Sequence, residues 1–518
     1  MKTNIFKNIF FIILILLIIL GVYILYKDGK RKVNLVTNNK LSIKTDNNLN
    51  IGIVNFDTIN PLITTNKNVI YIDKLIFESL IDITKDFKIQ NVLSKEFSKI
   101  NSKTYIVKLD ENKYWHDGTK FTAKDVIFTI DNLKNNKDSI YNKNVENIDK
   151  LEQIDDYTVK IILKEENAFF KYMMIFPILA SHAYDNMFMP TNEIPIGTGK
   201  YKIIKIMEEE IVLEKNDLDK SEKIENITIK LYDKANKMYG DFSKKIIDLI
   251  ITDNILYEEY VGSMGFNIAI SKNRIYNYIA INSENSILQN KEIRKAINFS
   301  IDKNSINYKV YNSRYLKSEN PLDYGNYLFK EENKNNVINA KEVLLQNGWS
   351  LKNNYWTKNG KKLSINLVIN NEKEENVLIA NELKEQLNNI GIELKIYQVN
   401  QDLYKNYMQN KNYDMILMET VLPIYPNLEM FFGENNLLNY KNEKITALIN
   451  QINFIEDENI LSKNYKEIIE IYNEEIPFIS LFNNPNYILY NENIKGDLSH
   501  NWYNVFYNID TWYKQIEQ

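Results

Sequence analysis

The chain alternates between short segments with apolar residues at every second position and longer segments in which apolar residues recur at helical spacing. Thr104–Leu109 and the stretches 159–163 and 227–231 show the alternating pattern, which predicts strands with one buried face. Residues 122–133 show helical spacing, and Thr122 at their start is a residue type that caps the first turn of a helix. The pattern therefore predicts a protein that contains both strands and helices.

The clearest order of elements lies in the C-terminal half. Residues 363–369 alternate as a strand, 377–390 are apolar at helical spacing, and 392–396 alternate again. Gly391 follows the helix, where the left-handed conformation that ends many helices favours glycine. These lengths predict a right-handed crossover between two parallel strands, and Tyr413–Met418 supplies a further strand. We therefore expect an α/β fold whose parallel strands are covered by helices.

An uncharged apolar run, Ile9–Tyr26, lies close to the N-terminus. It is about as long as the roughly 20 residues that a helix needs to cross a bilayer. Because it holds no Ala or Ser that would suit a signal peptidase, we expect residues 1–32 to form an uncleaved signal anchor. Residues 33–50 are polar and rich in Asn, which predicts a spacer between the membrane and the body of the protein.

The charge of the chain is nearly balanced, with 64 Lys and Arg against 68 Asp and Glu. Without residues 1–32 the chain keeps 58 basic and 67 acidic residues, which is a net charge of −9. The body also has no strongly basic stretch. Nucleic acid is therefore not expected as a partner.

The sequence has no Cys and only three His residues, which are far apart: His116, His182 and His500. Disulfides, thiolate zinc sites and a Ser-His-Asp triad are therefore not expected. No P-loop and no motif that carries a nucleophile occurs either. We expect a protein without enzymatic activity, cofactor or metal site, in which His116 is a satisfied surface residue.

Six short motifs follow one another along residues 51–510. They are Tyr114–Leu133 (YWHDGTKFTAKDVIFTIDNL), Pro195–Tyr201 (PIGTGKY), Asn290–Asp302 (NKEIRKAINFSID), Ala340–Trp349 (AKEVLLQNGW), Ile390–Leu394 (IGIEL) and Tyr413–Met415 (YDM). In this order they resemble the motifs of family 5 extracellular solute-binding proteins, the peptide/nickel receptors of ABC importers, which include the oligopeptide-binding proteins. Because turn and core positions usually serve packing, we expect most motif residues to be scaffold, with Arg294 and Asp302 on one side of one helix.

The resemblance implies a two-lobed periplasmic-binding-protein-like α/β fold of class II type, here with an N-terminal transmembrane helix. The first lobe would comprise residues 45–275 and 485–518, and the second lobe residues 276–484. Such receptors close around a ligand by a hinge motion. The implied function is a membrane-anchored substrate-binding component of an ABC importer. It would bind peptides or a related small solute outside the cell, serve permease and ATPase subunits, and be held in the cell membrane by a single pass through residues 9–26.

The loop after the Tyr413–Met415 motif departs from the peptide-binding members of the family. Those members carry GW-x-x-D in this loop, and the Asp captures the free ammonium of the peptide. In this sequence Glu419 and Thr420 replace the Gly-Trp pair, and Pro423 or Ile424 stands at the Asp position. Glu419 is a candidate replacement for the missing acid, since a carboxylate in a closed cleft pairs well with an amine. The alternative is a Glu at a strand end that points to solvent.

The resemblance also implies ligand contacts elsewhere. Tyr425 lies in the same loop, and a tyrosine there can stack on a ligand or hydrogen-bond it. The segment 481–484 corresponds to a crossing strand that lines the cleft of the family, and residues 55–62 (NFDTINPL) to a loop at the edge of the cleft. These correspondences add four candidate ligand-binding residues: Phe482, Asn483, Asp57 and Asn60.

Two other interpretations remain open. The altered loop, together with a helical anchor in place of a lipidated Cys, also fits an extracellular peptide-sensing receptor that signals to a membrane partner. Neighbouring permease and ATPase genes would favour transport, whereas an adjacent sensor kinase gene would favour signalling. An anchored hydrolase is the third interpretation, and turnover of a peptide by the purified protein would support it.

Overall fold

The computed structural model describes residues 45–184, 194–216, 223–323, 328, 340–434, 436, 438, 440–452 and 454–516. The predicted membrane helix Ile9–Tyr26 lies outside these residues. No helix within the described ranges is both long and apolar enough to cross a bilayer. The chain divides into two compact units, residues 1–46 with 515–518 and residues 47–514. The smaller unit contains strand β1 (Thr45–Asp46) and Gln515, the last residue of strand β23 (Tyr513–Gln515).

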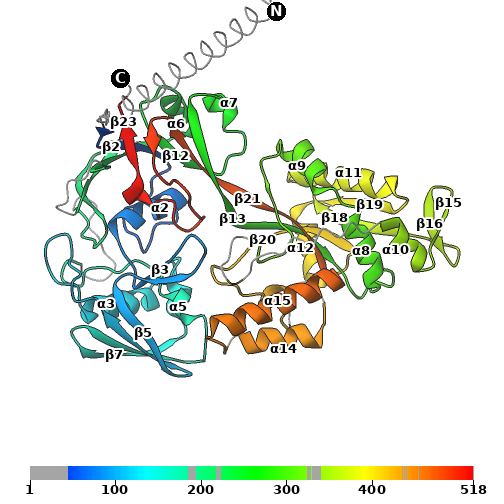
Figure 1. The fold of residues 1–518 in the computed structure, drawn as a ribbon, viewed down its shortest axis with the longest axis horizontal. Helices are drawn as coiled ribbons and strands as arrows, with labels where there is room; N and C mark the ends of the chain where they lie inside the picture. Colours follow the sequence, from blue (N-terminus) through cyan, green and yellow to red (C-terminus); the bar gives the residue numbers. More distant parts are fainter. Residues whose placement is uncertain are drawn as a thin grey trace, which may run out of the picture. The chain divides into compact units, whose positions relative to one another are not determined.

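Among the described residues of the larger unit, the largest sheet has eleven strands of mixed direction (Figure 1). Its order is β19-β18-β20-β13-β21-β12-β2-β11-β10-β9, and β14 adds to β21. The strands are β2 (Asn48–Val54), β9 (Tyr201–Ile206), β10 (Glu210–Lys215), β11 (Asn226–Tyr232), β12 (Leu249–Thr252), β13 (Phe266–Ile281), β14 (Leu316–Lys317), β18 (Ser364–Asn370), β19 (Glu393–Val399), β20 (Met415–Val421) and β21 (Phe478–Asn491).

The two longest strands, β13 and β21, lie side by side and antiparallel along their whole length (Figure 1). Near its C-terminal end, at residues 487–490, β21 also pairs with β12. Near its own C-terminal end, at residues 275–281, β13 also pairs with β20. The register between β13 and β21 shifts between Lys272 and Tyr276. The two strands thus connect two groups of sheet neighbours, and the predicted lobe bounds at 275/276 and 484/485 fall at this shift.

The predicted crossover is confirmed. β18 and β19 pair in parallel, and α11 (Glu374–Asn389) connects them. Gly391 has a φ of +93° directly after this helix, as the sequence predicts. A β-carbon there would also lie 2.9 Å from the Leu351 side chain. β20 adds to β18 in parallel, so this part of the sheet has the predicted α/β order.

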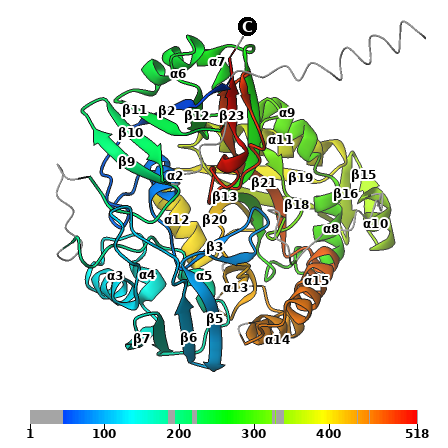
Figure 2. The same cartoon turned by 60° about the vertical axis from the view of Figure 1, so that its left-hand side comes forward.

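A separate antiparallel sheet of order β5-β6-β8-β7 contains two of the predicted strands (Figure 2). The predicted helix after Thr122 is α3 (Ala123–Asn135), and Asp125 Oδ2 accepts a hydrogen bond from Thr122 N at 2.8 Å. This bond closes the first turn of the helix, as a capping box does. The strands are β5 (Ser94–Asn101), β6 (Thr104–Leu109), β7 (Ile148–Asp155) and β8 (Thr158–Leu163).

Shorter sheets and further helices complete the unit. The small strands are β3 (Ile81–Ile83), β4 (Ile89–Asn91), β15 (Ser350–Lys352), β16 (Tyr355–Lys358), β17 (Lys361–Lys362), β22 (Ile494–Lys495) and β23 (Tyr513–Gln515). The remaining helices are α2 (Lys67–Ile76), α4 (Asn142–Val145), α5 (Phe170–Met173), α6 (Ala235–Ser243), α7 (Glu258–Val261), α8 (Lys291–Phe299), α9 (Lys303–Tyr311), α10 (Ala340–Gln346), α12 (Gln401–Asn410), α13 (Glu429–Phe432), α14 (Glu443–Ile452) and α15 (Glu458–Glu475), with a 3₁₀ turn at Ile509–Thr511.

Two predictions about local structure are wrong. The predicted spacer, residues 33–50, extends too far along the chain. β2 begins at Asn48, and Leu49 is fully buried in the core. Arg294 and Asp302 do not share a helix either. α8 ends at Phe299, and Asp302 caps the separate helix α9 by accepting from Asn304 N at 2.9 Å.

The glycines of the Pro195–Tyr201 motif are explained by close packing rather than by a bend. A β-carbon on Gly197 would lie 1.9 Å from Ile76 O, and one on Gly199 would lie 2.4 Å from Leu75 O. The motif therefore packs against the end of α2 at a distance that only glycine allows.

Candidate ligand-binding cleft

Asp57 and Asn60 shape the loop between β2 and α2. Asp57 accepts hydrogen bonds from Thr64 Oγ1 at 2.7 Å and from the backbone amide of Thr65 at 2.9 Å. Burial alone raises the pKa of Asp57, but these hydrogen bonds outweigh it and lower the pKa below its usual value. Asn60 is buried, and its Oδ1 accepts from Leu62 N at 3.1 Å. Both side chains thus fix the loop that leads into α2.

Glu419 and Thr420 lie near the end of β20, opposite Asn277 and Tyr276 of β13. The Glu419 carboxylate is exposed and pairs with Lys373 Nζ at 3.0 Å. Burial and then the Glu419 charge raise the pKa of Tyr315. Glu419 is therefore an exposed residue at a strand end whose carboxylate is paired with a lysine.

Tyr425 reaches two aromatic residues that are distant in sequence. Its ring stacks on Phe169, with 4.9 Å between the ring centroids, and lies 6.1 Å from Tyr172. Phe169 and Tyr172 also line a pocket of about 230 Å³ together with Leu461 of α15. Tyr425 thus contributes to a contact between the loop after β20 and the start of α5.

Phe482 and Asn483 lie on β21. Phe482 is fully buried and packs on Tyr311 and Tyr315, so its ring serves the core in this conformation. Asn483 is 1% exposed, and its Nδ2 donates to Asn273 O at 3.2 Å. Its Oδ1 has no hydrogen-bond partner in the described part of the chain. Asn483 Oδ1 is therefore available to accept a hydrogen bond from a ligand.

A pocket that the sequence analysis missed lies where β12 ends and α2 begins. It has a volume of about 340 Å³ and places Lys67, Asp253 and Asn486 around one space. Lys67 Nζ donates to Asn486 Oδ1 at 2.8 Å and lies 3.8 Å from Asp253 Oδ2. Apolar side chains and further amides also line it, among them Val54, Met238, Tyr239, Ile251, Asn68, Asn236 and Asn254.

Asn486 is the most constrained residue of this pocket. Its side chain has no exposed surface, and its Nδ2 has no hydrogen-bond partner among the described residues. Ser271 stands directly opposite it in the β13–β21 ladder, and its buried hydroxyl also has no partner there. An unpaired polar atom at such a position costs free energy unless a ligand or water satisfies it. Asn486 lies on the predicted crossing strand, two residues beyond the segment 481–484.

The histidines do not form a metal centre. Both ring nitrogens of His116 contact the glycine motif: Gly197 N donates to Nδ1 at 3.2 Å, and Nε2 lies 3.0 Å from Gly199 O. His116 is therefore satisfied as predicted, although it is half-buried. Burial lowers the pKa of His500 to about 4, so this residue is neutral at physiological pH. The described residues include no group of three or more His, Cys, Asp or Glu side chains that could hold a metal ion.

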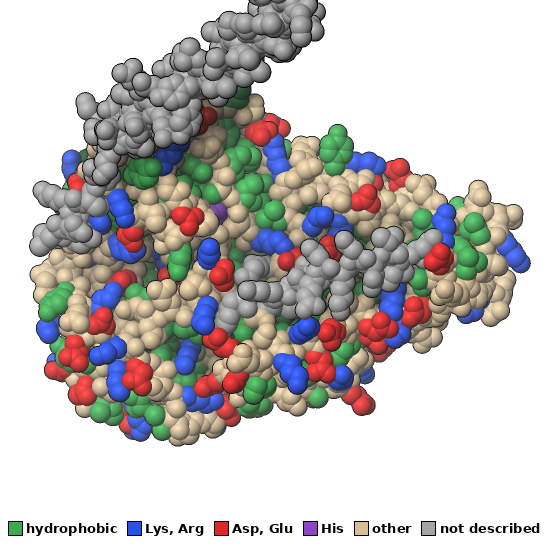
Figure 3. Space-filling model, viewed as in Figure 1, with side chains coloured by type: hydrophobic (Ala, Val, Ile, Leu, Met, Phe, Trp, Pro, Cys, Tyr) green, Lys and Arg blue, Asp and Glu red, His purple; other side chains and the backbone are tan. Residues whose placement is uncertain are grey.

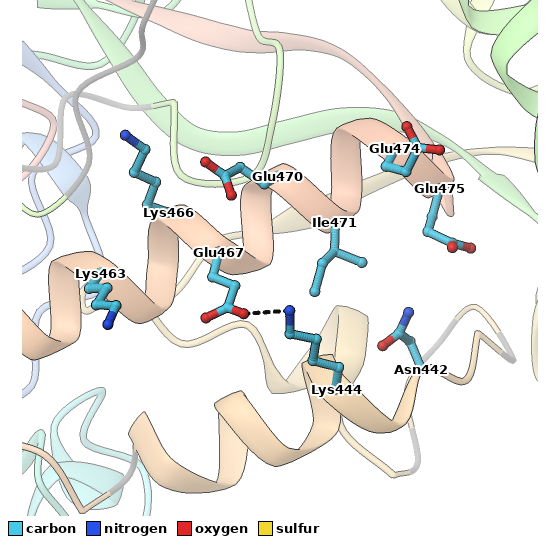
Figure 4. A pocket seen from close by; sticks show the side chains of 9 residues that line it. All are labelled: Asn442, Lys444, Lys463, Lys466, Glu467, Glu470, Ile471, Glu474 and Glu475. Atoms are coloured by element: carbon cyan, nitrogen blue, oxygen red, sulfur yellow. Dashed lines mark ion pairs between the residues drawn. The ribbon is translucent and has the colours of Figure 1, made fainter.

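A larger groove, of about 680 Å³, lies on α14, α15 and the residue before α14 (Figure 4). Lys444 and Glu467 form an ion pair of 2.5 Å across it. Along α15 the lysines of the lining, Lys463 and Lys466, lie toward one end and the glutamates toward the other. Figure 3 shows the same mixture of charges over the face in view. The groove offers many solvated charges but, among the described residues that line it, no buried polar atom without a partner, so it is less suited to a small ligand.

The sheet order and the two long connecting strands define a two-domain α/β solute-binding fold. A nickel ABC transporter protein of Bacillus halodurans shares this fold, with a TM-score of 0.77 at 18% identity, covering 89% of this chain and 98% of that one. An ABC transporter substrate-binding protein of Sinorhizobium meliloti gives a TM-score of 0.76 at 19% identity, with coverages of 89% and 98%.

Sequence comparison narrows this class to one family. The oligopeptide-binding protein AppA of Bacillus subtilis is 26% identical over 491 residues, which cover 88% of this chain and 89% of AppA. The family described as "Bacterial extracellular solute-binding proteins, family 5 Middle" matches residues 88–437. The chain belongs to this family and is therefore a binding protein rather than an enzyme, which confirms the resemblance read from the motifs.

Proposed function

We propose that the protein is the membrane-anchored, extracellular substrate-binding component of an ABC importer, and that it binds peptides or a related small solute between two lobes. The observation that carries this proposal is family membership, together with the pair of strands β13 and β21 that links the two parts of the main sheet. The lobes would be residues 45–275 with 485–518 and residues 276–484, and Ile9–Tyr26 would hold the protein in the membrane.

The relatives differ in what their names say they bind. AppA of B. subtilis is named for oligopeptides and the B. halodurans protein for nickel. A peptide or small organic solute fits this chain better than a bare metal ion, because the described residues contain no cluster of metal ligands. Ligand contacts would come from Glu419, Thr420, Tyr425 and Asn483, with Asp57 and Asn60 at the edge of the cleft.

Two measurements test the proposal. Native mass spectrometry of the full chain, purified in mild detergent, should reveal a co-purified peptide or small solute, and a peptide library should raise the melting temperature, because a ligand stabilises the form that it binds. Uptake of the identified ligand should require both this protein and an ABC permease. A ligand that binds but drives a signal without uptake would instead support the sensing receptor, and the absence of any ligand would contradict the proposal.

A further inference from the structure

The pocket around Lys67, Asp253 and Asn486 presents both charges and one unsatisfied donor within a small space. Its volume of about 340 Å³ lies at the lower end of the range of ligand pockets, about 300–1,000 Å³. The space therefore suits one small chemical group rather than a long peptide. Lys67 lies in the first turn of α2, Asp253 directly follows β12, and Asn486 lies on the long strand β21.

The Lys67–Asp253 pair is loose. At 3.8 Å, the distance between Nζ and Oδ2 is too long for a good hydrogen bond, and the Asp253 side chain is 62% exposed. Lys67 is held in place by Asn486 Oδ1 at 2.8 Å, which leaves donors of its ammonium group available. Both charged groups can therefore take a further partner without losing a tight contact.

The unpartnered Nδ2 of Asn486 indicates which charge the ligand group beside it should carry. Its only role is to donate, so it requires an acceptor, and Lys67 beside it favours an anionic one. A simple anion would lie close to the negative Asp253, and a simple amine would lie close to Lys67 and leave Nδ2 unsatisfied. A group that carries both charges on neighbouring atoms satisfies all three residues.

We propose that this pocket binds the zwitterionic headgroup of an α-amino acid, with the carboxylate on Lys67 Nζ and Asn486 Nδ2 and the ammonium on Asp253. The ligand is a single free amino acid, and its side chain lies against Val54, Met238 and Tyr239. This inference rests on the proposed function and gives it a substrate class. It assigns the capture of the ammonium to Asp253 rather than to Glu419, which is already paired with Lys373 at 3.0 Å.

Calorimetric titration of the full chain in mild detergent with each of the twenty common L-amino acids tests the ligand class. At least one should bind, and blocking its ammonium by acetylation or its carboxylate as an amide should weaken binding about tenfold or more, because each charged hydrogen bond contributes strongly. If no free amino acid binds while peptides do, this inference fails and the proposed function stands. If neither class binds, the proposed function fails as well.

Three variants test the geometry. Asp253→Asn should remove the preference for the free amine over its acetylated form, and Lys67→Met should remove the preference for the acid over its amide. Asn486→Leu should weaken binding of both, but Asn486 is fully buried, so the exposed Asp253 gives the test that does not depend on folding. Lys237→Met, on the neighbouring helix α6 but outside the pocket lining, is the matched control and should leave all preferences unchanged.

Each preference is specific to one variant, which a general loss of structure would not produce. If Glu419→Gln, rather than Asp253→Asn, abolishes the preference for the free amine, the ammonium lies at the end of β20 and the inference is overturned. The inference is also overturned if Asp253→Asn and Lys67→Met leave the preferences for the free amine and for the free acid as they are in the unmodified protein.

Discussion

Tyr425 stacks on Phe169, with 4.9 Å between the ring centroids and 23° between the ring planes. Tyr425 belongs to the loop after β20, and Phe169 directly precedes α5, so the contact joins the two segments that lie on either side of the predicted lobe boundary. Aromatic pairs of this kind contribute about 0.5–1.5 kcal/mol beyond the area that they bury.

This contact predicts a coupling that a double-mutant cycle can measure. Tyr425→Ala and Phe169→Ala should each lower the free energy of unfolding, and the double variant should lose less than the sum by about 0.5–1.5 kcal/mol. Denaturant unfolding of the four proteins provides the values. Tyr397→Ala is the control, since Tyr397 is 45% exposed and stacks on neither ring. Strict additivity of the two substitutions would contradict the contact.

A second prediction concerns the glycine motif. Gly197→Ala should lower the free energy of unfolding by about 1–3 kcal/mol or more, because its β-carbon would lie 1.9 Å from the backbone oxygen of Ile76, which cannot rotate away. Gly240→Ala in α6 is the matched comparison. A β-carbon there meets nothing within 4 Å, and alanine favours a helix by up to about 1 kcal/mol, so this variant should be slightly more stable. Equal stability of the two variants would contradict the close packing.

The sequence predicts local structure in this protein better than it predicts the site. The crossover of β18, α11 and β19 could be predicted because strand and helix periodicities depend on residues that are close in sequence. Gly391 marked the end of the helix. The break between Arg294 and Asp302 was not readable. Their spacing suits one helix, and only the packing shows that Arg294 instead donates to Glu475 O at 2.8 Å.

The pocket shows the same limit. Lys67, Asp253 and Asn486 come from three separate parts of the chain and form no motif, so no spacing could bring them together. The correspondence with the crossing strand pointed to β21, which also carries Asn486. It named Phe482, whose ring is buried, and Asn483, and stopped short of Asn486. Phe482, Asn483 and Asn486 lie on one strand, and a correspondence of short motifs does not settle which of them meets the ligand.

A third prediction concerns Arg314, which follows α9. Its guanidinium donates to Ile255 O and to the Glu258 carboxylate, and it lies 5.1 Å from the centre of the Tyr257 ring. Arg314→Lys keeps the charge but loses the planar fork that reaches both acceptors, so we expect a loss of about 1–3 kcal/mol in the free energy of unfolding. Chemical denaturation measures this loss, and Lys317→Met on the exposed strand β14 should change it by less than about 0.5 kcal/mol. An unchanged stability of Arg314→Lys would show that the fork is dispensable.

The last prediction concerns Asp73 on α2, whose carboxyl group is buried and has no hydrogen-bond partner in the described part of the chain. Burial, and then the charge of Asp57, raise the pKa of Asp73 well above its usual value, although Lys74 opposes this. The folded protein therefore keeps a proton that the unfolded chain releases above a pH of about 4. Stability should consequently fall as the pH rises from about 4 towards the folded pKa.

Asp73→Asn removes this titration while keeping the shape of the side chain, so the variant should gain stability relative to the unmodified protein at pH 7 and much less at pH 4. Urea unfolding at several pH values between these limits measures the difference between the two proteins. Asp149→Asn is the control, because Asp149 is exposed on β7. A difference for Asp73→Asn that does not change with pH would show that the buried carboxyl does not titrate on folding.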